Sequence, residues 1–112
     1  MCLFCKIIKK EIPAALAYED NDVLAFYDIN PQAPKHILVI PKKHIESLNT
    51  LVPEDSAVIA NIYQVIPQIA RTEGIAESGY RVVANTNRDA GQAVAHLHFH
   101  ILGGRQMQWP PG

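Results

Sequence analysis

Residues 96–101 alternate strictly between histidine and an apolar side chain, in the order His-Leu-His-Phe-His-Ile. Because successive side chains of a β-strand point to opposite faces, this segment predicts a strand with three imidazoles on one face. Leu97, Phe99 and Ile101 would then face a hydrophobic core. Histidine titrates near neutral pH, ligates metals and can act as a nucleophile. The alternation therefore constrains the fold and predicts a patch of reactive side chains on it.

Length and charge bound the class of protein. The 112 residues, 48% of them hydrophobic, predict a single domain over 1–112 that needs neither disulfides nor metals to bury a core. Ten basic and eleven acidic side chains leave a net charge of -1, which argues against binding nucleic acid nonspecifically. The sequence has no membrane-length apolar stretch and no signal-peptide pattern, so we expect a cytoplasmic protein without a membrane span.

Short apolar segments predict an antiparallel sheet. Residues 17–19 and 23–27 flank Asp20-Asn21-Asp22, a turn cluster typical of a hairpin. Two more strands are predicted over 36–40, where Pro41 follows, and over 80–85; the histidine segment makes a fifth. Short connections between strands favour an α+β fold: a five-stranded antiparallel sheet with one dominant helix. A Rossmann fold or Walker-type NTPase is disfavoured, because G-x-G-x-x-G and P-loop motifs are absent.

The long helix is predicted over 54–73. Pro53-Glu54-Asp55 opens it with acidic residues, which the helix dipole favours in a first turn. Its apolar stripe consists of Val58, Ile62, Ile66 and Ile69. Pro67 interrupts this pattern and is expected to kink the helix or end it early. The polar segment 86–92 has no periodicity and is expected to be a loop.

The residues alone leave three interpretations of the histidine patch open. It could be the solvated face of a half-buried strand, a catalytic zinc site with one open position, or a nucleophilic centre for an anionic substrate. The preceding loop favours the third, because Asn85, Gln92 and the backbone N–H groups of 90–93 could hold phosphate oxygens. Arg88 could add a charge-assisted contact, and Gly91 would let the backbone approach a ligand closely.

The sequence resembles a known superfamily. Residues 96–102 have the His-x-His-x-His-x-x form, with x apolar, of the histidine triad (HIT) superfamily. Residues 103–112 are similar to the C-terminus of its Hint branch of nucleotide-binding proteins. The segments 4–8, 11–14, 28–34 and 41–45 are similar to that branch as well. The resemblance covers residues 2–112 and implies a homodimeric α+β fold: a HIT-like five-stranded antiparallel sheet with one long helix and a short one.

The resemblance implies a nucleoside phosphoramidase that binds purine nucleoside monophosphates and releases AMP or GMP. His98 would attack the α-phosphorus and form a nucleotidyl-histidine intermediate, which water hydrolyses. This chemistry requires a neutral His98, whose other ring nitrogen should donate to a fixed acceptor such as a backbone carbonyl. His100, Gln92 and loop N–H groups would meet the developing charge. The predicted catalytic set is His36, His96, His98 and His100.

The same resemblance assigns a nucleotide-binding site. Asp28 would accept hydrogen bonds from the ribose hydroxyls, although a carboxylate before Pro31 is also a common loop cap. Apolar side chains would sandwich the base, although each is equally an ordinary core residue. The predicted set is Leu3, Phe4, Ile7, Phe26, Asp28, Ile29, Leu38, Asn85, Gly91, Gln92, Ala93, His98 and His100.

Two positions depart from the family pattern. Ala93 stands where Hint proteins usually carry serine, whose hydroxyl can reach the leaving-group side of the phosphate. Alanine keeps the backbone N–H but loses that donor, so we expect altered turnover or leaving-group preference. Ala95 stands where a larger residue is common, and it would widen that edge of the site.

Cys2 and Cys5 form a Cys-x-x-Cys pair. Spacing alone leaves three possibilities open: half of a tetrahedral zinc site, a redox pair, or two unconnected thiols. Many bacterial HIT proteins that keep both cysteines bind zinc with two histidines. The resemblance carries this site onto Cys2, Cys5, His44 and His96, where a structural zinc would leave His98 free.

Assembly and substrate complete the expectations. Helix 54–73 and the strand near 80–85 are expected to form a homodimer interface, and Trp109 to reach the partner subunit's active site. Two alternatives to phosphoramidate hydrolysis stay open. One is hydrolysis of a dinucleoside polyphosphate or an acyl-adenylate by the same histidine. The other is a nucleotide-binding regulatory protein with incidental catalysis, an alternative that the alanine at position 93 favours.

Overall fold

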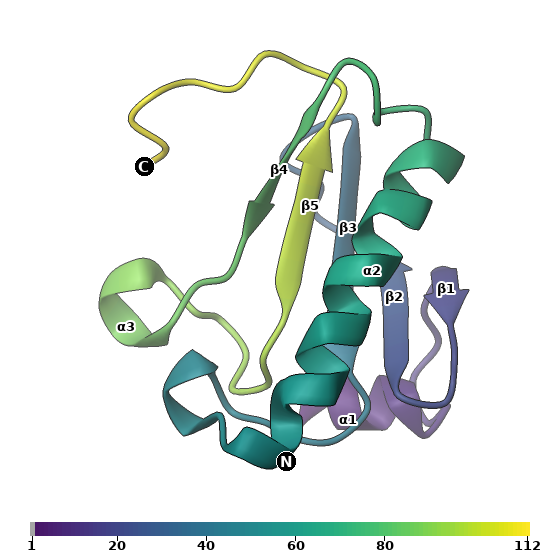
Figure 1. Cartoon of the computed structure of the whole chain (residues 1–112), viewed down its shortest axis with the longest axis vertical. Coiled ribbons are helices and arrows are strands. Elements are labelled where there is room, and N and C mark those ends of the chain that lie inside the picture. The colour runs from purple at the N-terminus through teal and green to yellow at the C-terminus, as the bar shows by residue number, and fades with distance from the viewer. Residues whose placement is uncertain (1) are drawn as a thin grey trace.

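A five-stranded antiparallel sheet organises residues 2–112, the part of the chain that this computed structural model describes (Figure 1). Its strands are β1 (Leu16–Glu19), β2 (Val23–Tyr27), β3 (Lys35–Pro41), β4 (Tyr80–Val83) and β5 (Phe99–Gly103). They lie in the order β1-β2-β3-β5-β4, and each neighbouring pair is antiparallel. The predicted α+β class and the five-stranded antiparallel sheet are confirmed.

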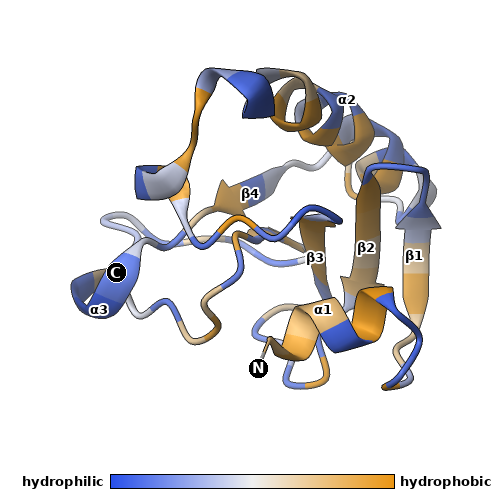
Figure 2. Ribbon diagram, turned by 90° about the horizontal axis from the view of Figure 1, so that it is seen from below, coloured by the Kyte–Doolittle hydropathy of each residue, from blue (hydrophilic) through white to orange (hydrophobic). Residues whose placement is uncertain are grey.

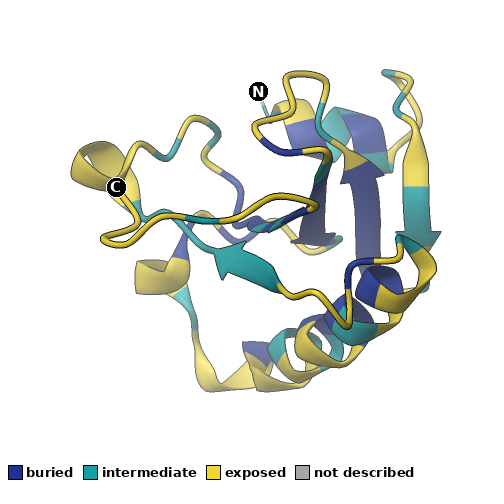
Figure 3. Ribbon diagram, turned by 90° about the horizontal axis from the view of Figure 1, so that it is seen from above, coloured by how far each residue is buried: buried dark blue, intermediate teal, exposed yellow. Residues whose placement is uncertain are grey.

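Helices cover both faces of this sheet. α1 (Leu3–Ile8) lies on one face and the long helix α2 (Ser56–Thr72) on the other (Figure 2). Because alternate side chains of β2 and β3 point to opposite faces, each helix covers a different set of them. The core under α2 includes Val23, Ala25, Ile37 and Val39, and the core under α1 includes Leu24, Phe26, Leu38 and Ile40. The central strands are therefore buried, whereas most of the C-terminal tail is exposed (Figure 3).

The predicted hairpin forms around Asp20. Its Oδ1 accepts hydrogen bonds from the backbone N–H groups of Asp22 and Val23, each at 2.8 Å. Its Oδ2 accepts a further bond from the Tyr18 hydroxyl at 2.8 Å. An aspartate that binds the backbone two and three residues ahead stabilises a tight turn, so this side chain fixes the β1–β2 connection.

Pro67 does not end α2, so the prediction of an early end is wrong. A 3-10 turn, η2 (Pro53–Asp55), precedes the helix, which then continues through the proline to Thr72. Buried residues stand on both sides of the proline: Ile62, Val65, Ile66, Ile69 and Ala70. Burying one such aliphatic side chain contributes about 1.5–3 kcal/mol. Together they exceed the roughly 3 kcal/mol that a proline inside a helix costs.

The strand that carries the histidines is shorter than predicted. β5 begins at Phe99, so His96 and His98 precede it. The ladder with β3 ends at the pair Val39–Phe99, and the N–H of Leu97 donates instead to the carbonyl of Ile45 at 2.6 Å. Pro41, the last residue of β3, has no N–H with which to extend the ladder. The alternation of faces persists, because Leu97, Phe99 and Ile101 all belong to the core under α2.

The segment 86–92 is not a plain loop. It contains the short helix α3 (Asn87–Ala90), which Gly91 ends in the left-handed conformation at φ 78°. A glycine in that position is a common helix C-terminal signal, so the sequence carried evidence for this helix. In addition to α1, the fold thus has a second short α-helix and a further 3-10 turn, η1 (Leu48–Thr50). Within residues 2–112 no helix combines the length and hydropathy that a bilayer span requires.

Candidate active site and metal cluster

His98 is buried and held in one tautomer. Its Nδ1 lies 2.7 Å from the backbone carbonyl oxygen of His96. A carbonyl can only accept, so Nδ1 carries the proton and donates it. In the neutral ring Nε2 then keeps its lone pair. The ring of Phe4 meets His98 edge-on, with centroids 5.2 Å apart. The fixed backbone acceptor expected for His98 is therefore present.

His36 holds His100 in the tautomer opposite to that of His98. The backbone N–H of Gln32 donates to Nδ1 of His36 at 3.0 Å, so that nitrogen carries no proton. Nε2 of His36 must then be the donor to Nδ1 of His100, 2.9 Å away, and it also lies 3.4 Å from Oδ2 of Asp28. In the neutral His100 ring the proton is left on Nε2. The site thus pairs a lone pair on His98 with an N–H donor on His100.

Burial keeps these two imidazoles neutral. The pKa of His100 is lowered to about 4, mainly by burial and also by the neighbouring rings of His98 and His36, while the charge of Asp28 opposes the shift. Burial also lowers the pKa of His36, again against Asp28. At neutral pH both rings are therefore uncharged, as the hydrogen-bond chain from Gln32 requires.

His36 and His100 meet because of the sheet register. His36 pairs with Leu102 and Leu38 pairs with His100 across the antiparallel β3–β5 ladder. The two histidines are therefore diagonal neighbours on one face, a distance that two imidazole rings can bridge. His98 stands two residues before His100, and the two ring centroids are 5.0 Å apart.

A cleft of ≈ 290 Å³ opens beside His98 and His100. Asp28 and Ala93 line it, together with apolar side chains from α1, β2 and β3. The predicted residues found in its wall are Leu3, Phe4, Ile7, Phe26, Asp28, Ile29, Leu38, Ala93, His98 and His100. Sequence reasoning missed Ile12, Pro13, Ala14, Tyr27 and Val94. The first three belong to the segment 11–14, whose family likeness was the available signal.

Asn85, Gly91 and Gln92 do not line this cleft. The side chain of Gln92 braces the loop around it. Its Nε2 donates to the carbonyls of Glu46 and Val94 at 2.7 Å and 3.0 Å, and its Oε1 accepts from the N–H of Asn87 at 2.9 Å. A phosphate contact by this amide would have to replace those bonds, so Gln92 is a loop-bracing residue in this structure.

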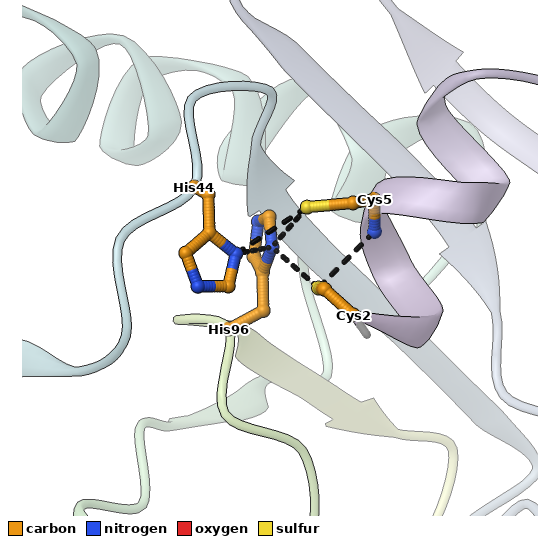
Figure 4. Close-up of side chains that lie close together, drawn as sticks. All are labelled: Cys2, Cys5, His44 and His96. Atoms are coloured by element: carbon orange, nitrogen blue, oxygen red, sulfur yellow. Dashed lines mark hydrogen bonds between the residues drawn. The ribbon is translucent and has the colours of Figure 1, made fainter.

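The ring of His96 belongs to a second cluster. Its Nε2 donates to the carbonyl of Pro41 at 2.8 Å, which leaves the lone pair on Nδ1. That nitrogen lies 3.3 Å from Sγ of Cys2, 3.6 Å from Sγ of Cys5 and 3.2 Å from Nδ1 of His44 (Figure 4). Of the predicted catalytic set, His36, His98 and His100 come together, while His96 contributes only its backbone carbonyl.

The four side chains of Cys2, Cys5, His44 and His96 could hold a metal ion. Their ligand atoms all lie within 4.8 Å of one another. Cys2 caps α1, where the backbone N–H of Cys5 donates to its sulfur at 3.2 Å. Burial and the neighbouring Cys2 thiol raise the pKa of Cys5, so the metal-free thiol stays protonated. Across residues 2–112 no group of potential ligands joins the three motif histidines, which disfavours a catalytic zinc held by them.

Known proteins share this architecture and sequence. A family model described as the HIT domain matches residues 9–107. The chain belongs to the HIT family. A HIT family hydrolase from Legionella pneumophila is 54% identical, with a TM-score of 0.98 and 100% of both chains covered. A histidine triad protein from Clostridium difficile is 48% identical, with a TM-score of 0.92, and 96% of this chain and 93% of that chain are covered.

A curated relative agrees with this HIT assignment. An uncharacterised HIT-like protein of Synechocystis sp. is 49% identical over 110 residues, which cover 98% of this chain and 96% of that protein. The similarity therefore extends over nearly the whole chain, beyond the part matched by the HIT model.

Proposed function

We propose that this HIT-family protein is a nucleoside phosphoramidase that releases AMP or GMP through a covalent intermediate on His98. The observation that carries the proposal is the pair of fixed tautomers. His98 offers a lone pair on Nε2, and His100 offers an N–H beside it. A nucleophile next to a donor suits attack on a phosphorus whose oxygens gain charge. The hydrolase name of the Legionella pneumophila relative agrees with this class of reaction.

The cleft supports a purine nucleotide as the group transferred. Phe4, Phe26 and Leu38 supply flat and aliphatic contacts for a base. Asp28 lines the same cleft, and its carboxylate suits the two hydroxyls of a ribose. With the base and ribose so bound, the α-phosphate would lie at His98 and His100.

The proposed reaction has two steps. The Nε2 lone pair of His98 attacks the α-phosphorus, the P–N bond breaks, and its electron pair leaves with the amine nitrogen, which takes a proton from solvent. His100 donates a hydrogen bond to a phosphoryl oxygen throughout. Water then attacks the phosphorus, the bond to Nε2 returns its electron pair to the imidazole, and a proton from that water goes to solvent. The net reaction consumes one water and releases the nucleotide and the amine.

A trapping experiment tests this proposal. Wild-type protein is mixed with excess adenosine 5'-phosphoramidate, quenched within milliseconds at neutral pH and measured as intact protein. We expect one adenylyl adduct, located on His98 by peptide fragmentation, and none on the His98→Ala variant. Turnover without an adduct, or an adduct on another residue, would contradict the proposal. Diadenosine polyphosphates and aminoacyl-adenylates assayed in parallel distinguish the alternative hydrolase, and nucleotide binding without turnover would indicate the regulatory protein.

We infer that the metal of the cysteine–histidine cluster is zinc. Tetrahedral zinc at ordinary bond lengths holds two nitrogens about 3.3 Å apart, and a nitrogen and a sulfur about 3.6 Å apart. The corresponding distances are 3.2 Å between the histidine nitrogens and 3.3–3.6 Å between nitrogens and sulfurs. Four protein ligands would close the site, so zinc would join α1 to the sheet and leave His98 free. Elemental analysis of fresh protein should find one zinc per chain.

We also propose a cytoplasmic homodimer built on α2 and β4. β4 is an edge strand, and Tyr63 on α2 is 54% exposed although its ring contacts Phe99. An unpaired edge and an exposed aromatic side chain together suit a symmetric interface. Trp109 is 82% exposed, which leaves it free to reach a partner subunit. Sedimentation at micromolar concentration should give twice the monomer mass.

A further inference from the structure

A second cleft adjoins the one that contains His98 and His100. Its volume is ≈ 470 Å³, and Leu3, Ala93 and Val94 line both clefts. Ala95 also lines this second cleft, so alanine methyl groups stand at two positions of its wall. The proposed nucleotide site therefore continues past Ala93–Val94 into the second cleft, where the proposed reaction places neither the base nor the ribose.

The in-line geometry of the proposed displacement indicates which part of the substrate would lie in the second cleft. In an in-line displacement at phosphorus, the departing group lies opposite the attacking nitrogen. When base and ribose fill the first cleft and Nε2 of His98 faces the phosphorus, the departing amine must lie outside that cleft. The second cleft begins at Ala93, a residue that lines the nucleotide site as well.

The second cleft has one acidic side chain in its wall. Glu46 is the one carboxylate or ammonium side chain in its wall, within the part of the chain that the structure describes. Cys2 and His44 also line it, but two thiolates and two neutral imidazoles around a divalent ion carry no net charge. The neighbouring Lys43 is held elsewhere, because its Nζ binds Oδ1 of Asp55 at 2.6 Å.

The Glu46 side chain is available for a ligand. It is exposed, and it takes part in none of the hydrogen bonds or ion pairs formed among residues 2–112. Only the backbone carbonyl of Glu46 is engaged, by Nε2 of Gln92 at 2.7 Å. That bond fixes the position of the residue and does not depend on its side chain.

We propose that this second cleft is the leaving-group subsite and that Glu46 makes it selective for amines with a second positive charge. The inference rests on the proposed phosphoramidase activity and specifies its substrate class. A leaving amine with a distant ammonium group would place that charge near the Glu46 carboxylate. A neutral amine of equal length would fill the same space without that attraction.

Two matched substrates test the selectivity. AMP is linked through nitrogen to 1,4-diaminobutane or to 1-aminopentane, so that the leaving groups have similar length and differ in charge. The measured quantity is the ratio of kcat/KM for the charged over the neutral substrate at low ionic strength. Since an exposed ion pair contributes little, Glu46→Gln should lower this ratio about threefold. Glu46→Lys should lower it further.

Glu77→Gln is the matched control, because Glu77 is an exposed carboxylate in the turn after α2 and lines neither cleft. Its charge ratio should equal that of the wild type. Salt should abolish the difference between wild type and Glu46→Gln, because the interaction is exposed to solvent. An unchanged ratio in both Glu46 variants overturns the inference while the phosphoramidase assignment stands. Failure of the wild type to release AMP from either substrate overturns both.

Discussion

The backbone carbonyl of His96 accepts the Nδ1 proton of His98 at 2.7 Å, while the ring of His96 faces the two cysteines. One residue thus connects the proposed nucleophile to the cysteine–histidine cluster. The imidazole of His96 is itself anchored by the carbonyl of Pro41 at 2.8 Å. A change in the position of the cluster would therefore act on the residue whose carbonyl sets the tautomer of His98.

Metal removal should accordingly affect both stability and chemistry. Chelation, or Cys5→Ser, is expected to lower the midpoint of thermal unfolding, because the ion binds only the folded arrangement of ligands. Zinc at 100 times its dissociation constant contributes about 2.7 kcal/mol to folding. The turnover number should fall as well, with a smaller change in AMP affinity. Calorimetry and single-turnover assays before and after zinc is restored measure this, and a metal-free protein of unchanged stability would contradict it.

His36 is expected to act as a positioning residue for His100. His36→Ala removes the donor that keeps the proton of His100 on Nε2, so kcat should fall about 10- to 100-fold while AMP binding changes little. His36→Gln retains an N–H donor and should recover part of the loss. Nitrogen-15 NMR of His100 reports the tautomer directly. Retention of the Nε2-protonated form in His36→Ala would refute this role.

Acid should destabilise the protein at a pH where most carboxylates are still ionised. An unfolded histidine binds a proton near its ordinary pKa of 6.5, whereas the pKa of folded His100 is lowered to about 4. Between these values the unfolded state binds more protons, so the free energy of unfolding falls as the pH decreases. Urea titrations of chelated protein at pH 7.5, 6 and 4.5 measure this. The free energy of unfolding should change less steeply with pH in His100→Asn. Equal stability of the wild type at all three pH values would exclude the effect.

Ala93→Ser should raise turnover on substrates with poor leaving groups. Ala93 is exposed where the two clefts meet, so a serine hydroxyl there can donate to the departing nitrogen without displacing a neighbour. One added hydrogen bond in the transition state corresponds to about a fivefold gain. The gain should be absent for a good leaving group. Ala95→Ser, which lines only the second cleft, serves as the control, and equal gains in both variants would argue against a specific donor.

Much of this architecture could be predicted because it depends on local patterns. The alternation of Leu97, Phe99 and Ile101 placed that face in the core, and the Asp20 turn predicted the hairpin. The start of β5 could not be predicted, since it depends on where Pro41 of a distant strand ends the ladder. The continuation of α2 through Pro67 depends on tertiary burial, which outweighs local propensity.

The predictions for the site differ in the same way between local motifs and contacts of distant segments. Spacing and resemblance indicated ten residues that line the cleft beside His98 and His100, and they also indicated Asn85, Gly91 and Gln92, which do not line it. The bracing role of Gln92 was missed, since its partners include Glu46, which is 46 residues away. The resemblance placed His36 and His100 in one catalytic set, but the hydrogen-bond chain from Gln32 through His36 to His100 was not predicted, because its members come from separate segments.

The β3–β5 register determines how substitutions far from the cleft would affect this site. A slip of one residue between these strands would turn His100 toward α2 and bring an aliphatic side chain to its place beside the cleft. Reactivity is therefore a property of strand alignment in the most deeply packed part of the molecule. Substitutions that loosen this ladder should inactivate the protein before they unfold it.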